Sequence, residues 1–292
     1  MRITEGMRFA QIQRNASRIG EQHAEASKQV MTGERLDRPS RDPMAAAELS
    51  RLRASLSSAS GHRETIRMVR GDAELSESTL AQASDLMTRA RELALGGANG
   101  ALSADERSVM ADEVRGVKEE LLRLANTRGS KGYLFGGSRT DQPAFDASGA
   151  FQGDQGEQRV DIGGSSPTVV NPSGARAFTA AGGRDVFGDL DALAAALDAN
   201  DRTATAATLS GIEASQDQMT SERARSGILV ARLETSDAVI EQLEFDYASR
   251  QNDIGAADPF EAITRMQALS GALERNVAVA RQIMDLSLIS RF

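Results

Sequence analysis

The C-terminal stretch, residues 259–292, places the strongest constraint on the fold. Its apolar side chains follow alternating steps of three and four residues, the period of a coiled coil, if Ser270 fills the one polar gap. The members of this seam are Ile263, Met266, Leu273, Val277, Ala280 and Met284. A helix with such a seam buries it against another helix. The stretch therefore predicts a partner from elsewhere in the chain or from another copy.

A matching seam lies at the other end of the chain, in a helix predicted over residues 3–31. Its members keep the same spacing without a break: Phe9, Ile12, Ala16, Ile19, His23, Ala26 and Val30. The two seams predict that the terminal helices pack together, or against copies of themselves, while the rest of the chain loops out and back. Their large apolar members form the predicted assembly interface: Phe9, Ile12, Ile19, Val30, Ile263, Met266, Leu273, Val277 and Met284.

A polar joint follows the first helix. Helical periodicity stops at Gly33, where a left-handed cap costs little, and residues 32–43 then hold two prolines and six charges. Asp42 followed by Pro43 is the pattern of an N-cap and a first helical residue, so a new helix is predicted from Met44. The joint residues selected from this pattern are Gly33, Arg35, Pro39, Asp42 and Pro43.

The central part predicts further long helices. Residues 44–128 indicate a hairpin of two antiparallel helices, with a capping box at Ser103 and Glu106 opening the second of them. Its first helix has the seam Ile66, Val69, Ala73, Ser76, Leu80, Ala83, Met87, Ala90 and Ala94, and its second has Met110, Val114, Val117, Leu121 and Leu124. After a short helix at 190–199, another long helix repeats every seven residues at Ile212, Met219, Ser226, Leu233, Ile240, Tyr247 and Ile254.

The amino-acid composition changes between these helical parts. From Gly129 to about Gly188, glycine, serine, proline and aspartate become frequent, and short apolar runs lie between turn residues. The fold class predicted from the whole pattern is mainly α. It is a long antiparallel coiled-coil helical bundle built from both chain ends, with a small inserted β-rich domain.

Three domains are predicted from the same pattern. Residues 1–41 plus 256–292 form a terminal coiled-coil domain, and residues 42–130 plus 189–255 form a central helical bundle. Residues 131–188 form a small β-rich projecting domain.

Composition excludes several classes of function. A net charge of -8 with a pI near 5.0 argues against nucleic-acid binding, because no basic patch is present to neutralise phosphates. No segment approaches the roughly 18 apolar residues of a membrane span, so no membrane partner is expected. The absence of cysteine removes disulfides, thiolate zinc sites and a thiol nucleophile.

Residues that could carry chemistry do not cluster. His23 occupies a core position of the first seam, and His62 lies beside Gly61 and Arg63, where solvation is expected. No carboxylate or histidine group has metal-ligand spacing, and residues 136–138 lack the lysine that follows a phosphate-binding loop. We therefore expect no catalytic residues, no metal, no cofactor and no enzymatic activity.

Several motifs carry a resemblance to a known family. TGERL at 32–36 with PSRDP at 39–43, and RARELA at 89–94, resemble the signatures of flagellins and their hook-associated relatives. ANT at 125–127 and GYLFGG at 132–137, followed by Pro143 and Phe145, resemble the hook-filament junction members more than flagellin itself. The resemblance covers roughly residues 1–145 and 200–292.

The resemblance implies a structural role in the extracellular flagellum, at the hook-filament junction. Such proteins pass unfolded through the flagellar type III export apparatus, and a small export chaperone holds the C-terminal helix beforehand. They assemble as a ring of copies on hook-associated protein 1 and present the surface on which flagellin polymerises. Flagellin itself is the nearest alternative, a soluble coiled-coil signalling or interaction protein is another, and an enzyme is the weakest.

The seams predict that residues 1–40 and 256–292 are disordered in the isolated subunit and fold on assembly. Ala16, His23, Ala26, Ser270 and Ala280 bury little apolar area against an ordering cost of about 1 to 2 kcal/mol per residue. Limited trypsin digestion of the monomer should remove both ends quickly and leave residues 42–250 as a stable core. Protected termini in a verified monomer would rule this out.

Overall fold

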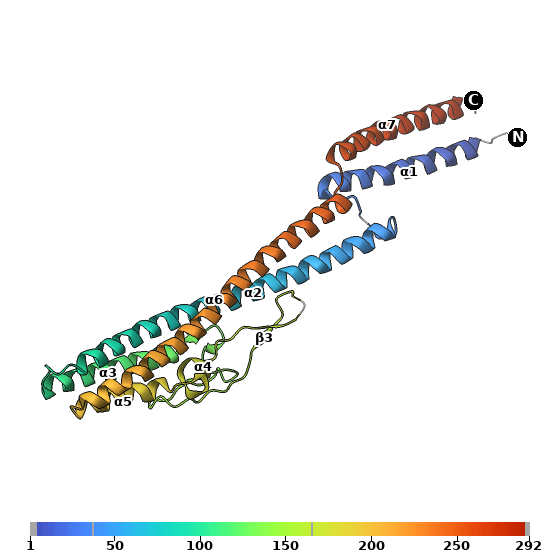
Figure 1. Ribbon diagram of the computed structural model, residues 1–292. Coiled ribbons are helices and arrows are strands. Elements are labelled where there is room, and N and C mark those ends of the chain that lie inside the picture. The colour runs from blue at the N-terminus through green and yellow to red at the C-terminus, as the bar shows by residue number, and fades with distance from the viewer. Residues whose placement is uncertain (1–4, 37, 165, 290–292) are drawn as a thin grey trace. The chain divides into compact units, whose positions relative to one another are not determined.

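A computed structural model describes residues 5–36, 38–164 and 166–289, with the side chains of residues 5, 6, 8, 9 and 283–289 outside the description. The chain is mainly α, as predicted (Figure 1). Its helices are α1 (Glu5–Thr32), α2 (Pro43–Gly97), α3 (Ala104–Ala125), α4 (Gly174–Phe178), α5 (Val186–Asp198), α6 (Arg202–Gly255) and α7 (Pro259–Ile289), with a 3-10 turn η1 (Ala180–Gly182). The strands have two residues each: β1 (Arg128–Gly129), β2 (Gly132–Tyr133), β3 (Arg159–Val160) and β4 (Thr168–Val169).

The chain divides into two compact units. The first contains residues 1–58 and 243–292, and the second contains residues 59–242. The helices α2 and α6 each run from one unit into the other. The predicted division into three domains, with limits at 41/42, 130/131, 188/189 and 255/256, stays a prediction about independently folding parts.

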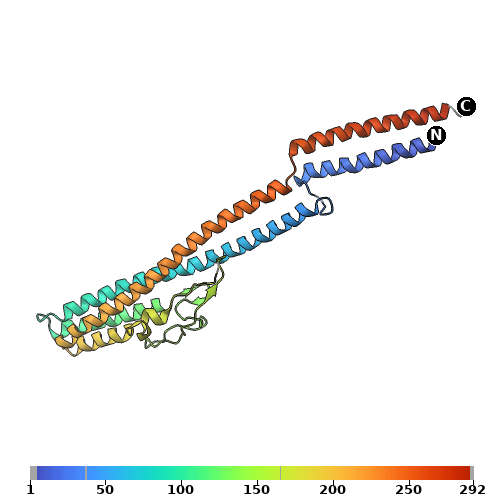
Figure 2. The same ribbon diagram turned by 45° about the vertical axis from the view of Figure 1, so that its right-hand side comes forward.

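In the first unit, α1 and α7 lie side by side and run antiparallel (Figures 1 and 2). The α1 seam faces α7 as expected, since its described members are all buried or half-buried: Ile12, Ala16, Ile19, His23, Ala26 and Val30. The predicted member Phe9 has its side chain outside the described residues. The two chain ends therefore supply each other's partner.

Two residues of the seam predicted for α7 do not face α1, so their predicted role in assembly stays a prediction. Ile263 is 39% exposed and Val277 is 43% exposed. The buried or half-buried stripe of α7 instead runs through Ala262, Met266, Leu269, Leu273, Asn276 and Ala280. This stripe also has steps of four and three, but it is less apolar, which is why the residues beside it gave the stronger signal. Met284 lies outside the described side chains.

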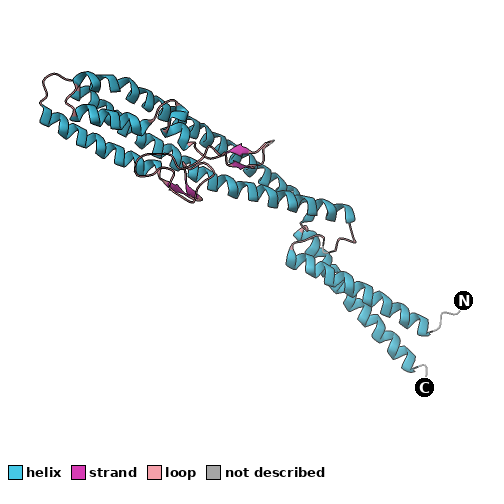
Figure 3. Ribbon diagram, turned by 90° about the horizontal axis from the view of Figure 1, so that it is seen from below, coloured by secondary structure: helices cyan, strands magenta, loops and turns pink. Residues whose placement is uncertain are grey.

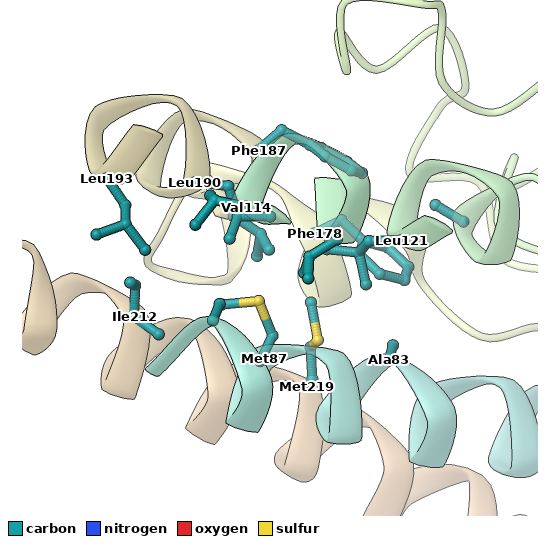
Figure 4. Packing of buried hydrophobic residues seen from close by; sticks show 14 of the residues in the cluster. Ala83, Met87, Val114, Leu121, Phe178, Phe187, Leu190, Leu193, Ile212 and Met219 are labelled. Atoms are coloured by element: carbon teal, nitrogen blue, oxygen red, sulfur yellow. The ribbon is translucent and has the colours of Figure 1, made fainter. Parts of the chain in front are cut away.

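The second unit is a helical bundle with one main core. Figure 4 shows Met87 of α2 and Met219 of α6 pointing into a space shared with Val114, Leu121 and Phe178. The seam predicted for α2 is buried at every position from Ile66 to Ala94, and Val114, Val117 and Leu121 of α3 are buried too. The heptad pattern thus located the inner faces of both helices correctly.

Helix ends in the bundle are fixed by side-chain hydrogen bonds. The capping box of α3 is present as predicted, because Ser103 accepts from the backbone N–H of Glu106 while the Glu106 carboxylate accepts from the Ser103 backbone. Hydrogen bonds from the backbone and hydroxyl of Ser103 lower the pKa of Glu106. Next to this cap, the buried Arg107 donates to the carbonyls of Gly97, Leu102 and Asn99 and to the amide oxygen of Asn200.

The β-rich part consists of two small antiparallel sheets beside the bundle (Figure 3). Arg128 pairs with Tyr133 in the first sheet, and Arg159 pairs with Val169 in the second. Four phenylalanines near these strands are buried in the main core of the bundle: Phe135, Phe145, Phe178 and Phe187. The rings of Phe135 and Phe178 meet edge to face with centroids 5.4 Å apart. Aromatic packing thus joins this part to the helices.

The hairpin of β3 and β4 covers a second core. Ile162 and Val170 of the hairpin pack with Ile66 and Val69 of α2 and with Leu233 of α6. A two-helix seam alone leaves much of each apolar side chain in contact with water. The hairpin adds a third layer over this part of α2 and α6.

Asp146 organises the loop that precedes Phe151. Asp146 accepts hydrogen bonds from the hydroxyl and backbone N–H of Ser148, from the N–H of Ala150 and from the Gln152 amide. These bonds, the Ser148 hydroxyl first, hold the pKa of Asp146 below its usual value. A lowered carboxyl pKa means that the loop gains stability above the unfolded-state pKa and loses it as pH falls through the folded-state value.

Gly137 and Gly116 give a matched test of the loop geometry. Gly137 has φ +72°, and an added Cβ would lie 2.2 Å from the carbonyl oxygen of Asp154. We expect Gly137→Ala to lower the free energy of unfolding by at least about 1–2 kcal/mol, because left-handed backbone disfavours a side chain. Gly116→Ala on the open face of α3, where a Cβ meets nothing within 4 Å, should raise it by about 0.5–1 kcal/mol. Urea unfolding measures both changes in the free energy of unfolding. Equal changes for the two variants would contradict the left-handed turn at Gly137.

Candidate assembly surfaces

The joint of the first unit is a paired structure. The connection after α1 and the connection after α6 run antiparallel and bridge at Glu34 and Ala256. The N–H of Arg35 donates to the carbonyl of Gly255 at 2.7 Å, and the N–H of Ala257 donates to the carbonyl of Gly33 at 2.8 Å. Two short connections that each lack regular structure therefore stabilise one another.

Arg35 ties the joint to the end of α6. Its guanidinium donates twice to the carbonyl of Ile254, at 3.0 and 2.8 Å. The last carbonyls of a helix have no partner within the helix and carry its negative dipole end, so a cation is stabilising there. Gln29 of α1 in turn donates to the carbonyl of Arg35.

The remaining joint residues begin α2. The Asp42 carboxylate accepts from the N–H of Ala45, and Pro43 is the first residue of the helix, as the sequence predicted. Pro39 is exposed in a turn, and Gly33 has the left-handed φ of +69°. Arg41 forms an ion pair with Glu25 of α1. The structure thus brings Gly33 and Arg35 onto the connection between α6 and α7, while Pro39, Asp42 and Pro43 direct the chain into α2.

The α1 and α7 seam contains polar side chains. His23 Nε2 lies 2.9 Å from the Ser270 hydroxyl, in a half-buried position between the two helices. Asn276 is also half-buried in the seam, and Gln29 is 9% exposed. Most described members of this seam are only half-buried, whereas the α2 seam from Ile66 to Ala94 is buried at every position.

Large apolar side chains remain outside the seam on α7. Phe260 is 83% exposed and Val279 is 47% exposed, and the exposed Ile263 and Val277 join them. Between residues 268 and 280, only Glu274 and Arg275 carry a charge. A helix that is apolar on most sides is usually buried on most sides. α7 therefore has exposed apolar side chains on more than one side beyond the seam, and this exposed surface, called the outer face below, is suited to contact with another chain.

The predicted interface residues separate into two groups. Ile12, Ile19, Val30, Met266 and Leu273 meet along the seam within one chain. Ile263 and Val277 lie on the outer face, and the side chains of Phe9 and Met284 are not described. Leu269 of the seam and Phe260 of the outer face were missed. The seam could have been found from the alternative frame that begins at Ala262.

Within the described residues, no group of three or more histidine or acidic side chains could hold a metal ion. No described helix is long and apolar enough to cross a membrane.

Comparison with known proteins shows which class of proteins the chain resembles. The family described as the bacterial flagellin N-terminal helical region matches residues 3–140. The chain is 25% identical to flagellar hook-associated protein 3 of Escherichia coli, with 99% of this chain and 98% of that protein covered. It is 31% identical to the Salmonella typhimurium protein of the same name, over 61% of this chain and 57% of that one.

Solved structures show the same fold. A flagellar hook-associated protein from Vibrio parahaemolyticus has a TM-score of 0.68 at 22% identity and covers 74% of this chain and 100% of its own. FlgL from Bacillus cereus has a TM-score of 0.62 at 18% identity and covers 69% of this chain and 99% of its own. The fold of the chain is therefore that of these solved hook-associated proteins. The chain is thus similar to the flagellin N-terminal region over residues 3–140 and to flagellar hook-associated protein 3 over nearly its full length.

Charge substitutions on α7 test whether the seam and the outer face are each needed for assembly. Leu273→Asp places an uncompensated charge in the seam, at a cost of several kcal/mol, and should prevent the pairing of α1 with α7 and hence filament formation. Val277→Asp should leave the seam intact but also abolish filaments, since it alters the outer face. Motility assays and electron microscopy measure filament formation in cells that lack the wild-type gene and carry either variant.

Arg265→Asp is the matched control, because Arg265 is exposed and its one ion pair among the described residues is with Glu261, one turn earlier on the same helix. It should preserve filaments. Normal filaments with Val277→Asp would show that the outer face of α7 is not an assembly contact.

Proposed function

We propose that this protein is a structural component of the bacterial flagellum that forms the junction between hook and filament, on which flagellin assembles. The observation that carries the proposal is the match to flagellar hook-associated protein 3 of Escherichia coli along nearly the full length of both chains. Filament subunits share the helical ends, so the N-terminal family match alone does not separate the two roles. The full-length match favours the junction role over flagellin.

The terminal helices supply a physical basis for assembly. The α1 and α7 pair is weakly apolar inside and carries exposed Phe260, Ile263, Val277 and Val279 outside. Exposed apolar side chains gathered on one helix mark a contact surface. In our proposal, copies of the chain form a ring through these helices.

The proposed partners follow from the position of the ring between hook and filament. Hook-associated protein 1 lies beneath the ring and flagellin lies above it. The subunit reaches this extracellular site through the flagellar type III export apparatus, and an export chaperone holds the C-terminal helix before export. Neither a cofactor nor catalysis is part of the proposal.

Deletion of the gene tests the junction role. Hooks should remain intact, while flagellin is exported but appears in the culture medium instead of in filaments, because it lacks a surface on which to polymerise. Electron microscopy of the cells and immunoblotting of the medium measure both outcomes.

Complementation with the wild-type gene serves as the control and should restore filaments. If the deletion strain still builds normal filaments, the junction role is wrong. If the purified protein itself polymerises into filaments, it is a flagellin.

A further inference from the structure

Gly71 lies in the middle of α2, where the fold of the chain gives no reason for a glycine. It is exposed, and an added Cβ would meet nothing within 4 Å. Glycine inside a helix is less stable than alanine, because it loses more backbone freedom on folding. What glycine does permit is a close approach by a second backbone. The surface around Gly71 is therefore a candidate contact with another chain.

Gly71 belongs to an exposed row on the side of α2 that faces away from its buried seam. The row covers about three turns of helix without a charge, in steps of three and four residues. Its members, which we call the α2 exposed row, are Met68, Gly71, Leu75 and Ser78. Met68 is 47% exposed and Leu75 is 37% exposed. The row thus has the spacing of a helix-packing seam, but it lies in contact with solvent.

α6 has an equivalent row on the side that faces away from its own seam. The members are exposed, uncharged and spaced by the same steps, and we call them the α6 exposed row: Ala224, Ile228, Ala231, Thr235 and Ala238. Ile228 is 69% exposed and is the one large apolar side chain among them. Because its neighbours are small, another helix can approach the backbone of α6 closely.

The register inside the chain determines which members of the two rows would meet. α2 and α6 run antiparallel, with Ser76 opposite Ser226. Copies in a ring that are related by rotation about an axis parallel to these helices keep the same levels. The α2 exposed row of one copy then lies beside the α6 exposed row of the next copy in this register. The pairs that result are Gly71 with Ala231 and Leu75 with Ile228.

The charges beside the two rows are complementary in the same register. Arg67 flanks the α2 exposed row, and Glu234 flanks the α6 exposed row at the matching level and on the matching side. Both are exposed, and neither has an ion-pair partner among the described residues. On the other flank Asp72 is level with Arg232, but the turn that contains Lys131 already donates to Asp72. Arg67 and Glu234 are therefore the stronger pair.

We propose that the α2 exposed row of one copy packs against the α6 exposed row of the next copy, with Arg67 facing Glu234 across the contact. The inference rests on the proposed function, in which copies of the chain form a ring. The two rows differ, so the contact is head to tail and repeats from copy to copy. Since each row faces away from its own seam, one copy can hold a neighbour on each side.

A side chain at Gly71 separates assembly from the stability of the subunit. Gly71→Gln should raise the urea midpoint of the purified full-length protein, because it replaces glycine at an open helical position. In the deletion strain the same variant should fail to restore filaments, because the glutamine keeps α2 away from the neighbouring copy. Urea unfolding and electron microscopy measure the two effects.

Gly116→Gln is the matched control, because Gly116 is also exposed inside a helix and an added Cβ there meets nothing within 4 Å. It should raise the urea midpoint as well, yet restore filaments. The contact is wrong if Gly71→Gln restores filaments as fully as the wild type, or if Gly116→Gln also fails to restore them.

The flanking charges test the identity of the partner surface. Arg67→Glu and Glu234→Arg should each reduce the number of filaments per cell in the deletion strain, because two like charges then face each other. The double variant should recover filaments, since the attraction between neighbouring copies is restored with the signs exchanged. Full filament numbers with either single variant, or no recovery in the double variant, would overturn the proposed pairing.

The natural absence of cysteine allows a cross-linking test that does not depend on filaments. Full-length Leu75→Cys is mixed with a size-tagged full-length Ile228→Cys at high protein concentration and oxidised. A mixed disulfide dimer should form in the mixture, and neither variant alone should dimerise. Ala238→Cys in place of Ile228→Cys is the control, because it lies in the same row but about 15 Å farther along the helix. It should give no mixed dimer.

The cross-linking result distinguishes failure of the contact from failure of the junction role. If the deletion strain loses its filaments but Leu75→Cys and Ile228→Cys form no mixed dimer, the contact is wrong and the junction role stands. The contact is equally wrong if Ile228→Cys dimerises with itself or if Ala238→Cys reacts as well. If the deletion strain never loses its filaments, the junction role is wrong and cross-linking alone decides the contact.

Discussion

The packing of α2 against α6 is the interaction on which the second unit depends. Helical residues far apart in the chain meet in one seam, as in the buried hydroxyl pair of Ser76 and Ser226, which are 150 residues apart in sequence and 3.3 Å apart in space. Above and below that pair, Leu, Ile, Val and Met fill the seam and exclude water. Everything between the two helices must return the chain to this contact. α3, α5 and the β-rich part are therefore arranged around it.

Ion pairs reinforce the same arrangement at its surface. Arg89 of α2 binds Glu113 of α3, Arg91 binds Glu213 of α6, and Arg223 of α6 binds Glu77 of α2. Exposed pairs of this kind contribute little individually, typically less than about 1 kcal/mol each. These ion pairs instead help to fix the register of the two helices, because each pair forms in one register. A buried example, Glu222, holds Arg176 and the N–H of Ser173 and so fixes α4 against α6.

The α1 and α7 helices also pack along a seam, but the side chains of this seam are less buried. Only three described seam residues of α1 and α7 are buried: Ala26, Gln29 and Ala262. The joint compensates at one end, where Arg35 and the bridge between Glu34 and Ala256 hold the two connections together. A weak internal seam together with an apolar outer face is physically consistent with helices that gain most of their stability from neighbouring copies.

The sequence by itself determined the helices and most of their inner faces. Heptad spacing marks a buried stripe without any knowledge of the partner, which is why the seam from Ile66 to Ala94 and the capping box at Ser103 were found. The same argument failed on α7, where two overlapping stripes both have the right spacing. The more apolar one differs at Ile263 and Val277, which are exposed, while its other described members face α1.

Only the tertiary structure could decide between those stripes, because burial depends on where α1 lies. It also decided that Phe135, Phe145, Phe178 and Phe187 belong to the core of the bundle, since a loop-rich stretch gives no periodic signal for its aromatic residues. The role of Arg107 is a further example. A single arginine on a helix is usually predicted to be a solvated charge. The fold buries Arg107 because the preceding segment supplies three carbonyl acceptors and the distant Asn200 supplies the fourth.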